Sequence, residues 1–462
     1  MKCPHCGTDT EAALPRCIAC GKSLQVTASD FFSERESRPR GAGEGSPWGP
    51  GLLVVLIVLG LVAFGLYQAM GHVRRQPLST ADVGGMAGSA PLPTKFPMSP
   101  VPKGLPRAPL IQPVSVRLPG LAPFHLAFGS RDRRVRQLFL ERNGGDARSE
   151  DAVERGLKWL ADNQNKETGA WEGGGANGGR PEFNLGVTGL ALLAFLGSGH
   201  THLADGPYKE TVAKAIQYLL SQQNSQGQFP GRLYHQGICT MAIVEAYGMT
   251  GDSMLQLPSE RAVAAIVASQ TESGGWDYNF SSPNSRGDTS VTGWQVMALK
   301  SARRVGIEFP EETLKRAREF LAGVYRDGFV GYSNVDRWWS SNGLTAAGVN
   351  ADLYSAVEAD GEDVHGALGH VLRHLPDEPR PHGNGWAPNA DIYFWYHGNL
   401  ALSRLGGQEW RFWNDRVKPM LCRLQAKEGY WDTYGDPWRD YGGRLYFTAL
   451  CILALEVYYR YD

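Results

Sequence analysis

Four of the seven cysteines lie within the first 20 residues, at Cys3, Cys6, Cys17 and Cys20. They form two CxxC pairs separated by ten residues. A two-residue gap lets one tight turn aim two thiolates at a single ion, and two such turns complete the tetrahedral S4 site that is usual for structural zinc. All four ligand positions are then filled, so we expect no catalytic role for the ion. Two disulfides or a redox CxxC are the alternatives.

A second set of polar residues recurs in the carboxyl-terminal part of the chain at intervals of 51 to 53 positions. Its members are Asn184, His235, Asp288, Ser341, Tyr393 and Arg444. Four positions further on stand Thr188, Cys239, Thr292, Thr345, His397 and Thr448. Residues four apart share one face of a helix, so the two sets predict two stacked polar rings. The rings either bind a ligand or cap helices, a role that suits Asn, Asp, Ser and Thr.

A repeated helical unit must position these rings. From about residue 149 each unit has an amphipathic helix, a loop with glycine and an aromatic residue, and a second helix rich in small and apolar residues. Gln164, Gln223, Gln270 and Gln425 close the first helix in four units. We expect a mainly α fold in which six hairpins close into an (α/α)6 toroid over 149–462, with the second helices inside. An open solenoid is the alternative.

The cysteine module resembles a small zinc ribbon over 1–25, followed by a polar linker over 26–50. Leu52 to Met70 carry no charge and are long enough to cross a hydrocarbon core of about 30 Å, so we expect one transmembrane helix over 51–71. Residues 77–123 contain eleven prolines, which predicts a semi-rigid linker over 72–148. Arg131, Arg133, Arg134 and Arg136 follow, and we expect a solvated basic surface or a contact with lipid phosphates.

The predicted localisation is the cell membrane. Because thiolate ligands favour a reducing compartment, we place the amino terminus in the cytoplasm and the toroid outside. A net charge of −1 excludes a polybasic protein, so no nucleic-acid partner is expected. No organic cofactor is evident, and the expected partners are the membrane, an isoprenoid or lipid ligand, and proteins bound through the ribbon and toroid.

The Gln–Gly–aromatic repeats resemble the αα-toroids of squalene cyclases and of protein prenyltransferase β subunits, and residues 287–294 resemble bacterial membrane-anchored members. The resemblance implies two chemistries. In squalene cyclases an Asp-x-Asp-Asp-Thr motif supplies the acid. Asp288 and Thr289 match its end, but Gly287 stands where the acid belongs, so Asp288 is the one candidate catalytic residue.

The second implied chemistry is the zinc-dependent thiol activation of prenyltransferases. Asp336 and His397 match two of the three ligands, whereas Trp338 replaces the cysteine. Because both motifs are incomplete, we expect a membrane-anchored toroid that binds an isoprenoid-like ligand or an envelope partner. A terpenoid cyclase or a prenyltransferase acting on a long isoprenoid is the alternative.

Overall fold

The computed structural model describes residues 127–280, 286–335, 338–355, 362–379, 381–382, 385–386 and 390–460. The four amino-terminal cysteines, the predicted span and the predicted linker up to residue 126 lie outside these residues. Within the described ranges no helix combines the length and the apolar character needed to cross a bilayer.

Six helical hairpins make up the described part of the chain. Their first helices are α4 (Ala147–Asp162), α6 (Lys209–Gln222), α8 (Ser253–Ala268), α10 (Glu311–Val324), α12 (Glu362–Arg373) and α14 (Gly407–Leu424). Their second helices are α5 (Asn184–Gly197), α7 (Leu233–Thr250), α9 (Thr289–Arg304), α11 (Asn342–Ser355), α13 (Ile392–Leu405) and α15 (Arg439–Leu455). Short strands β1 (Tyr325–Arg326) and β2 (Phe329–Val330) pair antiparallel, as do β3 (Pro381–His382) and β4 (Gly385–Trp386).

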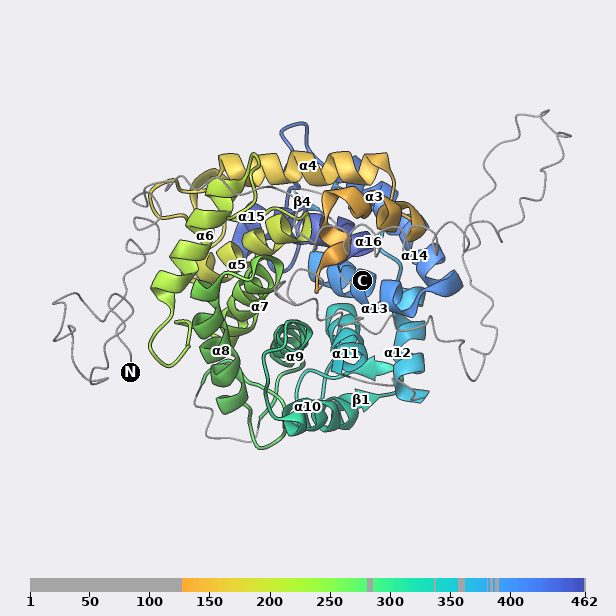
Figure 1. The fold of residues 1–462 in the computed structure, drawn as a ribbon. Coiled ribbons are helices and arrows are strands. Elements are labelled where there is room, and N and C mark those ends of the chain that lie inside the picture. The colour runs from red at the N-terminus through yellow and green to blue at the C-terminus, as the bar shows by residue number, and fades with distance from the viewer. Residues whose placement is uncertain are drawn as a thin grey trace, which may run out of the picture. The chain divides into compact units, whose positions relative to one another are not determined.

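The second helices form a closed inner ring. Each contacts the next along the chain, and α15 returns to contact α5. Figure 1 shows this ring within the outer helices, with α4 and α10 on opposite sides. The toroid predicted from the repeats is therefore present, and the contact between the last and first hairpins excludes the open solenoid.

The outer and inner helices differ in how their apolar residues are distributed. In α4 the apolar residues Leu157 and Leu160 are fully buried, whereas Lys158 lies on the exposed side. In α5 every residue from Leu185 to Gly197 is buried. A helix with one apolar face covers a core, and a helix that is apolar all round lies within it.

The four glutamines act as staples between neighbouring hairpins. The side-chain amide of Gln270 donates to the carbonyl of Gly274 in its own loop, at 2.7 Å, and to Thr313 of the next outer helix, at 2.8 Å. Gln425 donates in the same way to Gly429, at 2.8 Å, and to Ala152 in α4, at 2.7 Å. The last staple therefore joins the sixth hairpin to the first.

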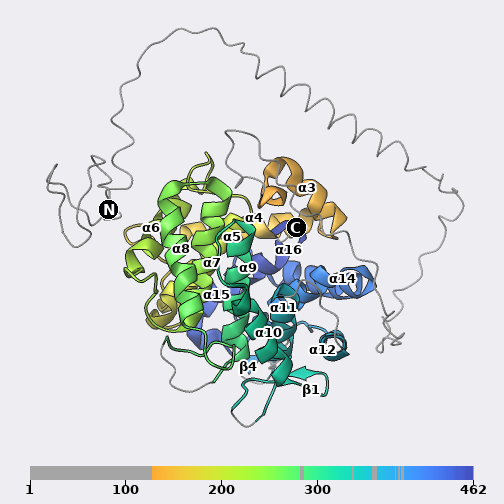
Figure 2. The same cartoon turned by 60° about the horizontal axis from the view of Figure 1, so that its bottom comes forward.

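A segment before the first hairpin closes one end of the ring. It contains the 3-10 helix η2 (Gly129–Arg131) and helix α3 (Arg133–Arg142), which contact the short final helix α16 (Val457–Arg460). In Figure 2, α3 and α16 lie at one end of the toroid and β1 and β4 lie at the other. We call the end that contains α3 and α16 the closed end. It corresponds to the carboxyl termini of the inner helices, and α3 lies within the range 72–148 that the sequence predicts to be a linker.

Buried ion pairs hold the closed end together. Arg131 and Arg460 donate to the same oxygen of Glu245, at 2.8 and 2.9 Å, and Ser301 donates to the other oxygen at 3.1 Å. Ser198 donates to Glu456 at 2.7 Å, and Arg460 lies 3.5 Å from that carboxylate. The charges of Arg131 and Arg460 offset burial and hold the pKa of Glu245 below its ordinary value.

The prediction of a solvated basic run is wrong for two of its arginines. Arg131 is 1% exposed, and Arg136 is buried against the carbonyl of Ser198 at 2.7 Å and against Glu150 at 3.0 Å. Arg131 also donates to the carbonyl of Arg460. Cations are stabilised at helix carboxyl ends, where carbonyl groups lack intrahelical partners. Arg131 and Arg136 therefore serve the ends of the inner helices rather than solvent.

Candidate ligand-binding mouth

The amino-terminal ends of the inner helices all lie opposite the closed end, because the hairpins repeat with the same polarity. Each end is preceded by the loop of its own hairpin. We call this region the mouth; it comprises these loops and the first turn of each inner helix. Carboxylates are stabilised at helix amino termini, and three of them, Asp288, Asp391 and Asp436, lie here.

Three of the six residues of the first predicted ring hold loops or helix ends in place. Asn184 accepts a hydrogen bond from the backbone N–H of Gly173 at 2.8 Å. Ser341 accepts from Leu344 at 3.1 Å, as a capping residue does. Arg444 donates to the carbonyl of Ala176 at 3.2 Å and lies over the ring of Tyr430. These three side chains have structural partners.

Threonines of the second predicted ring hold the loop aromatics. The hydroxyl of Thr188 accepts from the backbone N–H of Trp171 at 3.0 Å, and the indole N–H donates to Leu160 at 2.7 Å. Thr292 holds Trp276, and Thr448 holds Trp431, in the same manner. Thr345 accepts from Val330. Cys239 is a buried thiol beside the carbonyl of Leu185.

Asp288 caps α9 and is fully buried. Its Oδ1 accepts from the backbone N–H groups of Ser290 and Val291, at 2.9 and 3.0 Å, and from the Ser290 hydroxyl at 2.5 Å. Its Oδ2 lies 3.8 Å from a guanidinium nitrogen of Arg286 and has no partner within ordinary hydrogen-bond geometry among the described residues, although the Tyr332 hydroxyl is near enough to lower the pKa of this carboxyl. Burial raises the pKa of Asp288, although the hydrogen bonds from Ser290 and Val291 act in the opposite direction.

Tyrosines surround this carboxylate. The Tyr234 hydroxyl lies 2.5 Å from Ser290 Oγ, so a hydrogen-bonded chain runs from Tyr234 through Ser290 to Asp288. The Tyr278 and Tyr332 hydroxyls lie 2.7 Å apart, and the guanidinium of Arg286 stands over both rings. Burial raises the pKa of Tyr234 well above its ordinary value, and the charge of Asp288 adds to the effect.

Tyr393 and Asp391 form the opposite side of the mouth. Asp391 caps α13 through Phe394 at 2.9 Å, and Asp436 accepts from the backbone of Ile392 at 2.8 Å. Burial raises the pKa of Asp391 to about 6 and that of Asp436 to about 7. Tyr393 is 9% exposed, and its hydroxyl has no hydrogen-bond partner among the described residues. The charges of Tyr446, Asp288 and Asp391 add to burial in raising its pKa.

His235 lies on a third side of the mouth, at the start of α7. Its Nδ1 lies 3.0 Å from the carbonyl of Pro230, and its buried Nε2 has no partner among the residues that the structure describes. Burial lowers its pKa, so the ring is neutral at pH 7 and Nε2 is an acceptor when Nδ1 carries the proton. Phe183 packs edge-on against the ring.

The middle of the inner ring is filled by side chains. Trp294 of α9 stacks on Tyr396 of α13 at 5.8 Å and meets His397 edge-on at 5.7 Å, although α11 separates these helices in the ring. Nδ1 of His397 lies 3.2 Å from the amide of Asn350. Burial lowers the pKa of His397 to about 3, so this ring is neutral. The mouth is therefore separated from the closed end by packed aromatic residues.

Gly287 stands where the squalene-cyclase motif has its acid, and the packing around it explains why this residue is a glycine. A Cβ atom on Gly287 would lie 2.4 Å from the ring of Phe320. Phe320, from α10, thus occupies the space that a carboxylate at this position would need. The nearby Asp288 is the acid that remains.

The residues matched to a prenyltransferase zinc site do not fit a metal. Trp338 stands at the thiolate position and packs edge-on against Phe329, with Arg326 over its ring. His397 is enclosed and bonded to Asn350. Asp336 lies outside the described residues. Among the residues that are described, no group of three or more His, Cys, Asp or Glu side chains could hold a metal ion.

Sequence reasoning missed most of the mouth. Tyr278, Tyr332 and Asp436 are not among the predicted site residues, because hairpin loops differ in length and the 51- to 53-residue register does not extend into them. Also missing are Tyr234 and Asp391, which lie one and two positions before the register residues His235 and Tyr393. A usable signal was present in Tyr278 and Tyr332, which follow the loop aromatics Trp276 and Phe329 within three residues.

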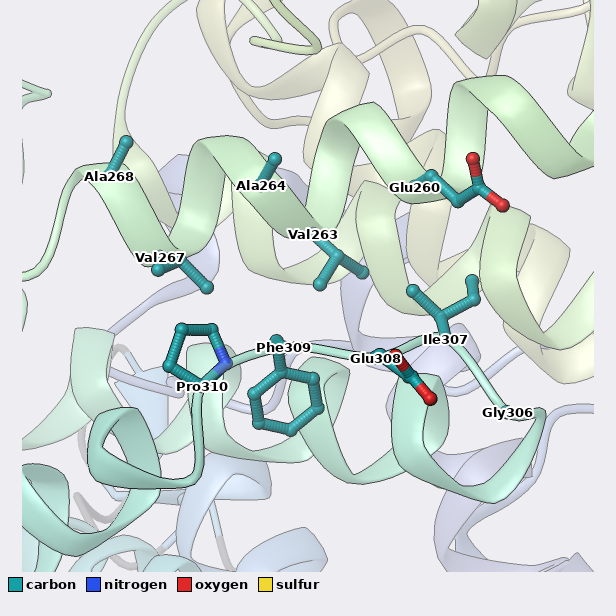
Figure 3. Close-up of a pocket in the computed structure, with 10 residues that line it drawn as sticks. All are labelled: Glu260, Val263, Ala264, Val267, Ala268, Gly306, Ile307, Glu308, Phe309 and Pro310. Carbon is teal, nitrogen blue, oxygen red and sulfur yellow. The ribbon is translucent and has the colours of Figure 1, made fainter.

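A separate groove lies on the outside of the toroid. It has a volume of about 600 Å³ between α8 and the loop from Gly306 to Pro310. Figure 3 shows Val263 and Val267 facing Phe309 and Pro310. This loop leads from an inner to an outer helix, so the groove belongs to the closed-end side and not to the mouth.

The fold and the mouth define the class of the protein, an αα-toroid with an enclosed, packed centre and one polar, aromatic end. Residues 186–354 match the family model described as squalene-hopene cyclase C-terminal domain. Over this stretch, which is less than half of the chain, the sequence is therefore similar to that domain. No curated protein matches the sequence.

The solved structures to which the chain is similar include a mannanase and a terpene cyclase. The GH76A alpha-1,6-mannanase from Salegentibacter sp. HEL1_6 is 10% identical with a TM-score of 0.52, over 68% of this chain and 100% of the mannanase chain. The type II terpene cyclase MstE from Scytonema is 14% identical with a TM-score of 0.47, over 67% of this chain and 97% of the cyclase chain. At this identity the mannanase likeness shows the fold alone.

Proposed function

We propose that this protein is a binding module, a membrane-tethered toroid that holds an envelope ligand or partner at its mouth. The filled centre supports this proposal most. Trp294, Tyr396 and His397 occupy the space in which a toroidal enzyme would enclose a long isoprenoid. An isoprenoid-like ligand therefore fits less well than a partner that binds at the mouth, where buried polar atoms lack partners among the described residues.

A photo-crosslinking amino acid in the full-length protein tests this. It is placed at Tyr441 on the mouth or, as a control, at Leu257 on the exposed side of α8. We expect a discrete adduct from position 441 and none from 257, with mass spectrometry identifying the adduct as glycan, peptide or lipid. Equal labelling from both positions, or none from 441, contradicts the proposal.

A terpenoid cyclase or prenyltransferase is the second candidate, and Asp288 favours the cyclase. Its carboxyl is fully buried and its pKa is raised, as suits a general acid. The test is incubation of the purified protein with squalene and with geranylgeranyl diphosphate. A cyclised product that is lost in Asp288→Asn would replace the binding proposal, whereas unchanged substrate supports it.

The amino-terminal features remain part of the proposal. We propose that Cys3, Cys6, Cys17 and Cys20 hold one structural zinc, and that residues 51–71 anchor the chain with the toroid outside the cytoplasm. Metal analysis of the purified protein should give one zinc per chain that is lost in Cys3→Ser with Cys6→Ser. A protease added to intact spheroplasts should degrade the toroid; protection of the toroid contradicts this orientation.

A further inference from the structure

The mouth carries exposed aromatic rings on two separate hairpins. Trp339, before α11, is 46% exposed and stacks on Tyr332 with ring centroids 4.6 Å apart. Trp438 and Tyr441, at the start of α15, are 42% and 37% exposed, and their rings lie 5.7 Å apart. Exposed rings supported by a second ring offer flat apolar faces whose orientation is already fixed.

Among the buried polar atoms of the mouth are three that can accept a hydrogen bond from a ligand. Asp288 Oδ2, His235 Nε2 and the Tyr393 hydroxyl are buried and have no hydrogen-bond partner among the described residues. They come from three different inner helices or their caps. A buried polar atom without a partner costs about 1–3 kcal/mol, so a ligand that donates hydrogen bonds here gains that free energy. Tyr393 and Asp391 also face one spot, because a Cβ on Gly343 would lie 3.3 Å from both.

The charges of the mouth offset one another. Arg180 lies over Tyr441 and Arg286 over Tyr332, so cations already cover aromatic faces at the rim. Arg286 is also paired with Asp277. A strongly cationic ligand would meet these arginines, and a strongly anionic ligand would meet Asp288 and Asp391. A neutral ligand rich in hydroxyl groups meets neither repulsion.

We propose that the mouth binds a neutral glycan chain, whose sugar rings stack on Trp339 and Trp438 and whose hydroxyls donate to Asp288 and Tyr393. This inference rests on the proposed function and names its ligand class. Sugar rings combine an apolar face with a rim of hydroxyls, which matches exposed aromatic faces above buried acceptors.

The test measures binding of neutral hexasaccharides to the full-length protein in detergent by isothermal titration. The panel is maltohexaose, mannohexaose, cellohexaose and chitohexaose. We expect at least one to bind, and we expect Trp438→Ala to weaken that binding by about tenfold or more, as loss of an aromatic anchor does. Trp438→Tyr keeps an aromatic face and should stay within about threefold. Leu257→Ala is the matched control at an exposed apolar residue outside the mouth and should change nothing.

Tyr393→Phe separates ligand binding from folding. The hydroxyl has no partner among the described residues, so its removal should leave the melting temperature unchanged or slightly higher. Binding of the hexasaccharide should weaken by about three- to tenfold, the value of one hydrogen bond. Undiminished binding in both Tyr393→Phe and Trp438→Ala overturns the glycan site.

The outcomes distinguish the two proposals. If no hexasaccharide binds while position 441 still crosslinks a peptide or a lipid, the glycan inference fails and the binding module stands. If no hexasaccharide binds and squalene is cyclised, both fail.

Discussion

The two ends of the toroid handle buried charge in opposite ways. At the closed end, Glu245 and Glu456 meet the side-chain cations of Arg131 and Arg460. At the mouth, Asp391 and Asp436 are held by backbone N–H groups at helix amino termini, and Asp288 Oδ2 and the Tyr393 hydroxyl lack partners among the described residues. Cations at helix carboxyl ends and carboxylates at amino ends follow the helix dipole. The contrast teaches that side-chain cations balance the buried carboxylates of the closed end, whereas backbone N–H groups hold those of the mouth.

Breaking the closed end should have the largest effect. Glu245→Gln keeps the shape of the side chain but leaves Arg131 and Arg460 buried without their shared carboxylate. We expect a loss of about 3–5 kcal/mol in the free energy of unfolding, measured by urea denaturation. Glu312→Gln, which removes an exposed pair with Lys315, should cost less than about 0.5 kcal/mol. Equal small losses would mean that the network contributes little.

Substitution of a loop glycine by alanine should have the next largest effect on stability. Gly274, in a mouth loop, has φ +90°, and a Cβ would lie 2.2 Å from the carbonyl oxygen of Arg316. Gly306, in a closed-end loop, has φ +80° with nothing within 4 Å. Gly306→Ala should cost about 1 kcal/mol from backbone strain alone, and Gly274→Ala about 1–3 kcal/mol more from the clash. Similar melting temperatures for the two variants would contradict the tight packing of the mouth loops.

Carboxylates of the mouth should make stability fall as pH rises. The pKa of Asp391 is 3.8 ordinarily and about 6 when folded. The folded chain therefore binds more protons than the unfolded chain between these values, and stability is lost as pH rises from about 4 to 6. Asp391→Asn keeps the cap and should remove about 2–3 kcal/mol of this loss, measured as unfolding free energy at pH 4 and 7. An unchanged pH profile would contradict a desolvated Asp391.

His200, at the closed end, should make stability fall as pH falls, which is opposite to the effect of Asp391. Burial lowers the pKa of His200 to about 4 from 6.5, and the nearby Arg136 and Arg133 add to the effect. The unfolded chain then binds more protons, so stability is lost as pH falls from 6.5 to 4. His200→Phe keeps the edge-on contact with Tyr208 and should be about 2 kcal/mol less sensitive to acid. A variant as acid-sensitive as the natural protein would assign the loss to other groups.

The exposed rim of the mouth should matter least for stability. Trp339→Ala removes one ring of the stacked pair with Tyr332 and should cost about 1 kcal/mol or less. Trp339→Phe should restore most of this. A much larger loss in thermal denaturation would make Trp339 a core residue rather than part of a binding surface.

The repeat, the closure and the inner position of the second helices could be predicted from sequence, because each signal has a local cause. Gln270 and Gly274 recur in other hairpins since every hairpin needs the same staple and the same tight turn. Asp288 and Tyr393 could be found because they lie within the helical register. Arg131 could not be placed, because its burial depends on Glu245, 114 positions away. No local pattern reports a pair so distant in sequence.

The staple from Gln425 to Ala152 has a consequence for synthesis. The hairpins that are synthesised first can form only an open arc. The first hairpin lacks its contact with the sixth until the sixth has been synthesised. Arg460, near the last described position, must then join Glu245 before the arc can lock. Truncation after Leu455 removes only α16 and should therefore leave a chain that chaperones retain and proteases degrade, even though all six of its hairpins are present.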